Sequence, residues 1–176
     1  TEGLSKEYRS KLLNIEYMAA VLIVLVLKHP LSDVYWLNIA DRSVPFIGII
    51  EHTNLVGPER YEGSHIVYLS NYLSEDHELY KMTGNELFDT YLPHLKKINP
   101  DFTADWVKEY HHHKIPNAQP IVDTNYGKNI PAHETGIQNL YLANTSQVYP
   151  QDRGTNYSVA MGRKMAHLAI SNLKNE

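Results

Sequence analysis

The sequence contains no cysteine in 176 residues, which excludes disulfide bridges, thiolate metal sites and cysteine nucleophiles. It also lacks both glycine-rich phosphate-binding signatures, Gly-x-Gly-x-x-Gly and Gly-x-x-x-x-Gly-Lys-Ser/Thr. A strand-turn-helix unit that grips a dinucleotide is therefore not expected within these residues. The formal net charge is −4, so no basic field attracts nucleic acid, and nucleic acid is not an expected partner.

Long hydrophobic runs are also missing. The longest apolar run covers residues 18–27, whereas a membrane-spanning helix needs about 20 apolar residues. The run also starts too late, and lacks the flanks, to be a secretory signal. We therefore expect no membrane span and a cytoplasmic protein. The β-branched residues of the run predict a strand that is buried on both faces.

The remaining composition is that of an ordinary folded protein, with 43% hydrophobic and 20% charged residues. Thirteen tyrosines against three phenylalanines are unusual, and tyrosine suits half-wet surfaces where its ring packs and its hydroxyl stays hydrated. Four tyrosines are candidates for lining a cavity: Tyr35, Tyr68, Tyr110 and Tyr126. The chain starts without methionine, and we expect it to be a piece of a larger protein.

Hydrophobic periodicity and turn residues predict the order of the elements. Strands are predicted at residues 15–28, 34–39, 65–73, 104–115 and 140–143, the last short and buried. Helices are predicted at residues 5–14, after a cap at 74–77, from the capping box at 83–86 to about 98, and at 154–174. Residues 45–52 form an apolar element of either type, and residues 116–131 a long ordered loop. Because strands and helices do not alternate regularly, we expect an α+β fold with a mixed or mainly antiparallel sheet and flanking helices.

The most informative segment lies near the carboxyl end of the sequence. It consists of Leu142-Ala143-Asn144, Tyr149-Pro150, Gly154-Thr155-Asn156 and Gly162-Arg163. The pattern predicts a strand end, a polar loop and a glycine at the start of a helix. A helix start has unpaired backbone N–H groups and the positive end of the helix dipole, so it favours an anionic or electron-rich edge of a ligand.

This segment resembles the closing motif of FAD-dependent oxidoreductases of the flavin amine oxidase superfamily, whose relatives include protoporphyrinogen oxidases, phytoene desaturases and UDP-galactopyranose mutases. In that family a strand ends in Gly-Asp or Gly-Glu, a loop with a Tyr-Pro-like pair follows, and a glycine opens a helix that carries Gly-Arg. Less specific likenesses to the substrate-side region of such proteins lie at residues 35–39, 48–54, 65–69 and 118–121. The resemblance implies a fragment of an FAD/NAD(P)-binding-type two-domain protein.

The resemblance also implies roles for four residues. Asn144 would lie where the acidic residue of the family approaches the flavin ribityl or pyrophosphate group. Gly154, Thr155 and Asn156 would lie under the pyrimidine edge of the flavin, where the helix start stabilises negative charge on the reduced ring. The departure is Ala143-Asn144 in place of Gly-Asp or Gly-Glu, because an amide hydrogen-bonds but adds no charge.

FAD is thus the implied cofactor of the full-length protein, and the implied partner is a missing amino-terminal dinucleotide-binding half. Residues 1–139 would be a substrate-binding α+β domain, and residues 140–176 a closing strand-loop-helix that completes the FAD site. The implied function is binding of a small-molecule substrate for hydride transfer to FAD in the full-length protein. The fragment alone is expected to be inactive and to lack FAD.

Two alternatives remain open. The first is a stand-alone, non-catalytic α+β binding domain that merely shares the closing motif. The second is part of a UDP-galactopyranose mutase-like flavoenzyme. A mutase needs arginines placed for a diphosphate, and the arginines of this sequence are scattered.

A polar cluster, Glu51-His52-Thr53-Asn54, follows an apolar element. It can face a substrate cavity, with His52 as a proton donor or acceptor, or it can hydrogen-bond the next loop at a strand end. On the first interpretation the candidate cavity residues are Glu51, His52, Tyr68 and Tyr110. The catalytic acid or base is not assigned from the sequence.

Three consecutive histidines, His111-His112-His113, suggest a metal site at first sight. On a strand, His111 and His113 point the same way and can share an ion. The sequence indicates no third ligand, and a solvated or substrate-facing strand explains the histidines equally well. We therefore expect no metal.

Overall fold

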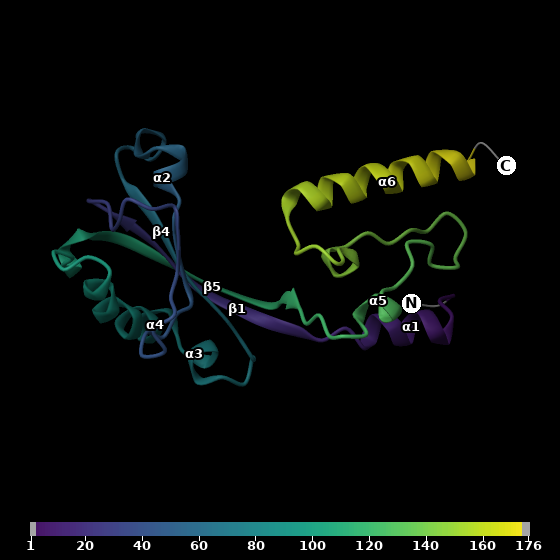
Figure 1. The fold of residues 1–176 in the computed structure, drawn as a ribbon, viewed down its shortest axis with the longest axis horizontal. Helices are drawn as coiled ribbons and strands as arrows, with labels where there is room; N and C mark the ends of the chain where they lie inside the picture. The colour runs from purple at the N-terminus through teal and green to yellow at the C-terminus, as the bar shows by residue number, and fades with distance from the viewer. Residues whose placement is uncertain (1–2, 174–176) are drawn as a thin grey trace. The chain divides into compact units, whose positions relative to one another are not determined.

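The computed structural model describes residues 3–173, and their contacts divide the chain into two compact units (Figure 1). Unit 1 joins the residues up to Tyr17 with those from Pro120 onward, and unit 2 is Met18–Gln119. The division predicted at residue 139 concerns function, namely substrate binding before it and FAD binding after it. It differs from the division by contacts, and it stays a prediction.

Unit 2 is built on a five-stranded antiparallel sheet in the order β2-β3-β4-β1-β5. In that order the strands are Trp36–Asn38, Gly48–Glu51, His65–Leu73, Tyr17–Leu27 and Val107–Pro120. Residues 45–52, for which the sequence left the element type open, contain the strand β3, and the strand predicted at residues 65–73 is confirmed as β4. The α+β class with a mainly antiparallel sheet and flanking helices is confirmed.

One face of this sheet forms the core of unit 2. The register aligns four residues of neighbouring strands: Leu37, Ile49, Leu69 and Ile23. The side chains of Ile49, Leu69 and Ile23 are at most 1% exposed. The helices α3 (Glu78–Lys81) and α4 (Gly84–Tyr91) and the 3-10 helix η2 (Leu92–Lys97) supply Leu79, Leu87, Tyr91 and Leu95 to the same core. Figure 1 shows α4 on the left side of the sheet. We call this side the covered face.

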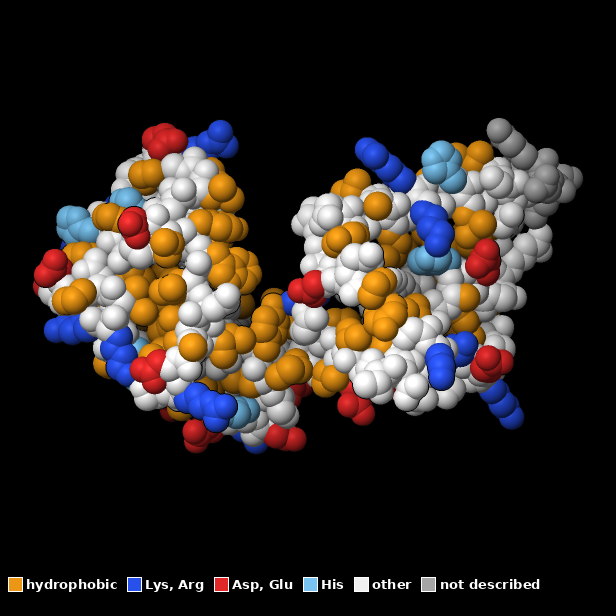
Figure 2. Space-filling view, viewed as in Figure 1, with side chains coloured by type: hydrophobic (Ala, Val, Ile, Leu, Met, Phe, Trp, Pro, Cys, Tyr) orange, Lys and Arg blue, Asp and Glu red, His pale blue; other side chains and the backbone are white. Residues whose placement is uncertain are grey.

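The opposite side, which we call the open face, is defined by six apolar or aromatic side chains: Trp36, Ile50, Tyr68, Val24, Ile66 and Val26. Because side chains alternate along a strand, each is the chain neighbour of a residue on the covered face. Five of them are half-buried, and Trp36 is 58% exposed. The prediction that residues 18–27 are buried on both faces is therefore wrong, since β1 is fully buried on one face only. Figure 2 shows a band of hydrophobic side chains along the edge of unit 2 opposite α4.

The helix predicted from the capping box to about residue 98 begins as predicted but changes type. Thr83 caps α4, and Glu86 completes the capping box by accepting from the Thr83 backbone N–H at 2.8 Å. The α-helix ends at Tyr91 and continues as η2, because Pro93 has no N–H to donate to the preceding turn.

Replacing Thr83 with alanine is expected to lower the free energy of unfolding by about 1 kcal/mol, because the first turn of α4 loses its side-chain acceptor. Hydrogen bonds from the backbone and side chain of Thr83 hold the pKa of Glu86 below its ordinary value. This contribution is present above the ordinary glutamate pKa and is lost as the pH falls through the lowered pKa. Thr83→Ala should raise the Glu86 pKa in an NMR titration, whereas Thr83→Ser should preserve it. Equal titration curves for the two variants would contradict the capping box.

The edge strand β5 differs from its prediction at both ends. Residues 104–106 form the 3-10 helix η3 (Ala104–Trp106), and the strand runs on to Pro120 instead of ending at residue 115. Pro116 lies inside a strand that has a neighbour on one side only, which is where sheets tolerate proline. The loop predicted at residues 116–131 is thus shorter, and it contains the helix α5 (Tyr126–Asn129).

Unit 1 consists of helices joined by long irregular segments. The helix α1 (Lys6–Leu13) is capped by Ser5, as predicted, and the Tyr8 hydroxyl donates to the Ala132 carbonyl at 2.8 Å. The 3-10 helix η4 (Thr145–Gln147) precedes α6 (Thr155–Leu173), which confirms the last predicted helix. Its predicted last residue, Lys174, lies outside the described residues. Among residues 3–173, no helix is long and apolar enough to cross a membrane.

The short buried strand predicted at residues 140–143 is wrong. Leu140 is 44% exposed, and the segment forms only an isolated bridge between Glu134 and Tyr141. The Leu140 carbonyl accepts from the Thr135 hydroxyl at 2.8 Å, and its N–H donates to the Ile137 carbonyl at 3.1 Å. The Leu142 N–H donates to the His133 carbonyl at 2.8 Å, so the segment pairs only with residues 133–135 across a tight turn and does not join the sheet.

Candidate functional site

The open face of unit 2 is the strongest candidate for a binding surface. The register places Trp36, Ile50, Tyr68 and Val24 in one line across β2, β3, β4 and β1. In the next position of the sheet, the His52 backbone N–H donates to the Ile66 carbonyl at 2.9 Å. Contiguous, partly exposed apolar surface of this kind is typical of an interaction site in a folded protein.

His52 lies on the open face, at the end of β3, in an aromatic setting. Its Nε2 atom is 2.7 Å from the hydroxyl oxygen of Tyr61, in the 3-10 helix η1 (Pro58–Tyr61). The His52 ring also meets the rings of Tyr61 and Tyr68 edge-on, with centroids 5.5 and 6.3 Å away. The structure thus brings two predicted residues, His52 and Tyr68, together with Tyr61, which the sequence did not single out.

Tyr61 was missed because it lies in a segment predicted only as a loop. Gly57, with φ of +88°, and Pro58 turn the chain at the end of the short helix α2 (Thr53–Val56). The turn returns residue 61 to the strand ends. The Gly-Pro pair signals a chain reversal, but it does not show which side chain the reversal places beside His52.

Glu51 does not share the surface with His52. Its side chain is fully buried, and its carboxylate accepts from the Leu31 N–H at 2.9 Å, the Ser32 N–H at 2.7 Å and the Ser32 hydroxyl at 2.9 Å. His65 lies near it, with Nδ1 4.0 Å from Oε1. Glu51 therefore holds the loop after β1, whereas its neighbour His52, which precedes α2, contacts Tyr61 and Tyr68 on the open face.

The other two residues of the polar cluster also make structural contacts. The Thr53 hydroxyl accepts from the Ile66 N–H at 3.2 Å. The Asn54 amide donates to the Ser32 and Val34 carbonyls at 3.0 and 2.9 Å. Of the four consecutive polar residues, His52 is the one placed for contact with a ligand on the open face.

The remaining tyrosine candidates lie apart from Tyr68. Tyr110 stacks on Phe88 of α4 with ring centroids 4.1 Å apart, and its hydroxyl donates to Asn85, so it lies on the covered face. Tyr126 is buried in unit 1, where burial raises its pKa and its hydroxyl donates to the Ser146 carbonyl at 2.7 Å. Tyr35 is 39% exposed beside Trp36.

The three histidines of β5 divide between the two faces. His112 lies against Gly84 on the covered face, and burial lowers its pKa. By alternation His111 and His113 face the opposite side, where both are exposed. Within residues 3–173 no three His, Cys, Asp or Glu side chains are grouped so as to hold a metal ion.

The closing segment lies wholly in unit 1. The Gly154 carbonyl accepts from the Ser158 N–H at 3.0 Å, so Gly154 caps α6, and Thr155 and Asn156 are exposed in its first turn. Asn144 is engaged elsewhere, because its Oδ1 accepts from the Ser146 N–H and hydroxyl at 3.1 and 2.5 Å. The structure thus places Asn144 at the start of η4 and the other three residues at the start of α6.

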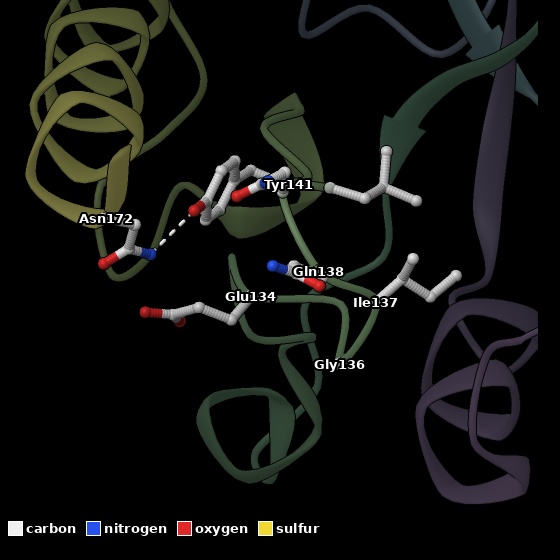
Figure 3. Close-up of a pocket in the computed structure, with 8 residues that line it drawn as sticks. Glu134, Gly136, Ile137, Gln138, Tyr141 and Asn172 are labelled. Atoms are coloured by element: carbon white, nitrogen blue, oxygen red, sulfur yellow. Dashed lines mark hydrogen bonds between the residues drawn. The ribbon is translucent and has the colours of Figure 1, made fainter. Parts of the chain in front are cut away.

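Unit 1 also contains an open pocket of about 420 Å³ that the sequence did not predict. Figure 3 shows this pocket, in which the Asn172 amide donates to the Tyr141 hydroxyl at 2.6 Å. That bond ties the irregular segment to the last turn of α6. The lining is Glu134, Gly136, Ile137, Gln138, Asn139, Leu140, Tyr141 and Asn172.

No protein-family model matches the chain, and no curated protein matches its sequence. Solved structures do match its fold. A protein from Exiguobacterium sp. 255-15, provisionally named protoporphyrinogen oxidase, is 12% identical with a TM-score of 0.69, over 92% of this chain and 37% of that one. An oxidoreductase from Methanosarcina mazei is 19% identical with a TM-score of 0.64, over 94% and 38%. A reduced UDP-galactopyranose mutase is 17% identical with a TM-score of 0.55, over 74% and 29%.

These likenesses establish a shared fold. This chain spans less than two fifths of the length of each of the three structures.

Proposed function

We propose that this chain is the substrate-binding portion of an FAD-dependent oxidoreductase, and that a further amino-terminal half supplies the grip on the dinucleotide. The open face is the observation that carries the proposal. The names of two of the solved structures support an oxidoreductase, and the greater length of all three supports a missing half. Cytoplasmic location remains a prediction.

In this proposal the open face contacts the apolar body of a small-molecule substrate. Trp36, Ile50 and Tyr68 provide flat or branched apolar surface, and desolvation of both partners favours binding. Rigid strands hold these side chains, so the surface is formed before the substrate arrives. Flavin, when bound, accepts a hydride from a C–H or C–N bond.

The start of α6 fits a flavin edge, and Asn144 fits less well. Thr155 and Asn156 lie in the first turn of a 19-residue helix that has no acidic residue there, so its N–H groups favour an electron-rich edge. The Oδ1 atom of Asn144 is already occupied by Ser146. We therefore propose Gly154, Thr155 and Asn156 as flavin contacts, with Asn144 shaping the loop before them.

Replacing Gly154 with leucine in the full-length parent is expected to lower its flavin content at least about tenfold, because the added side chain fills the helix start. A Cβ at Gly154 meets only the flexible end of Asn156, at 2.7 Å, and Tyr157 at 3.6 Å, so the fold itself should tolerate the change. Gly162→Leu is the matched control on the same helix, since nothing lies within 4 Å of its Cβ position. Flavin absorbance per protein gives the result.

Unchanged flavin content in Gly154→Leu would contradict the proposed contact. Micromolar or tighter FAD binding by residues 1–176 alone would contradict the half-site. A parent gene that encodes no glycine-rich dinucleotide fingerprint upstream of Thr1 would favour the stand-alone binding domain instead.

A further inference from the structure

His52 and Tyr61 form a hydrogen-bonded pair on the open face. The pair combines an imidazole, which can accept or donate a proton, with a hydroxyl that restrains its ring. The Nε2 atom of His52 is engaged by the Tyr61 hydroxyl at 2.7 Å, and no hydrogen bond is formed by its Nδ1 atom within the described residues. Nδ1 is therefore the ring atom left for a ligand.

The surroundings of the pair are mainly apolar. Ile50, Ile66 and Tyr68 are the neighbours of His52 on the open face, and none of them carries a charge at neutral pH. A ligand that covers this surface therefore excludes water from the His52 ring, which strengthens any hydrogen bond to Nδ1.

The charged and titratable groups near His52 are few. Tyr61 and Tyr68 contact its ring, and the exposed Glu59 and Arg60 on η1 make no ion pair with it within residues 3–173. The exposed histidines of β5 lie on the same side of the sheet but form no hydrogen-bonded pair with a tyrosine there. His52 is thus the half-buried and oriented proton acceptor of this surface.

We propose that His52 is the catalytic base for a substrate on the open face and that Tyr61 is its positioning residue, an assignment that rests on the proposed function. The substrate has an apolar body and one N–H or O–H group. That bond breaks, its electron pair stays on the substrate nitrogen or oxygen, and the proton forms a new bond to Nδ1. The step uses the tautomer in which the His52 Nε2–H donates to the Tyr61 hydroxyl oxygen, so that the lone pair of Nδ1 accepts the proton.

The first test uses the 176-residue chain and ring ¹⁵N NMR, with His52→Gln to assign the signal. In the neutral ring of His52 the Nε2–H tautomer should dominate, seen as widely separated ring ¹⁵N shifts with the proton on Nε2, because Tyr61 engages that atom. A dominant Nδ1–H tautomer would overturn the assignment of Nδ1 as the proton acceptor. Tyr61→Phe should average the two shifts, whereas Tyr35→Phe, the matched loss of a neighbouring hydroxyl, should not. Averaged shifts in the unmodified chain, or no effect of Tyr61→Phe, would overturn the positioning role.

The second test measures flavin reduction by the full-length parent with two probes, protoporphyrinogen and benzylamine. His52→Gln should lower kcat about 100-fold and remove the acid limb of the pH profile, as expected for a lost general base. Tyr61→Phe should lower kcat several-fold and keep that limb, and His94→Gln, on the covered side, should change neither.

The two proposals fail in distinguishable ways. A parent that binds flavin and keeps its acid limb in His52→Gln overturns the catalytic role of His52 and leaves the oxidoreductase intact. A parent without flavin overturns the oxidoreductase.

Discussion

Replacing Leu25 with alanine is expected to lower the free energy of unfolding of unit 2 by about 4 kcal/mol, because a fully buried leucine leaves a cavity in a central strand. Leu22→Ala is the matched control in the same strand. Leu22 faces the open side and is only half-buried, so its loss should cost about 1 kcal/mol. Urea unfolding followed by tryptophan fluorescence measures both, since Trp36 and Trp106 are the two tryptophans and both lie in unit 2.

Equal costs for the two substitutions would show that both sides of β1 are packed to the same extent. That result would remove the basis for the open face as a binding surface. The comparison therefore tests the central observation of the proposed function without a ligand, a cofactor or the rest of the parent protein.

Replacing Glu51 with alanine is expected to cost about 3 kcal/mol, because it leaves two backbone N–H groups and a hydroxyl without their shared acceptor. Glu51→Gln keeps one acceptor oxygen but turns an amide toward donors, so an intermediate loss is expected. The exposed Glu59 serves as the control, and Glu59→Ala should change stability by less than about 0.5 kcal/mol. Urea midpoints of the three variants give the comparison.

A Glu51→Ala chain that unfolds at the same urea concentration as the Glu59→Ala chain would mean that the carboxylate does not hold the loop. The sequence-based interpretation of Glu51 as a cavity residue would then regain support. The expected loss instead assigns Glu51 to the support of the strand end that presents His52.

The regular parts of the fold were predictable because their signals are local. The capping box at Thr83, the cap at Ser5 and the alternation in residues 65–73 each specify the structure of the residues next to them. The prediction of a buried strand at residues 140–143 was wrong because a local pattern does not show whether a sheet partner is available. The four apolar residues of this segment carry a strand pattern, but the segment pairs only with residues 133–135 across the turn at Leu140.

The candidate site was predictable only in part, because it depends on the face to which each strand residue points. Glu51 and His52 are adjacent in sequence, yet one is buried beneath the loop after β1 and the other faces outward. Tyr110 and Tyr68 have the same chemistry, yet α4 covers the first. Tyr61 needed the chain reversal at Gly57 to reach His52, which no periodicity reports.

The two outer strands of the sheet have a consequence for self-association. β2 has only three residues, and β5 bears Lys108, Glu109, Lys114 and Pro116 along its length. Short edges, charges and proline all discourage another chain from adding a strand. The hydrophobic band beside them has no such protection. Isolated chains would therefore associate by hydrophobic contact between their open faces, and not by adding strands to the edges of the sheet.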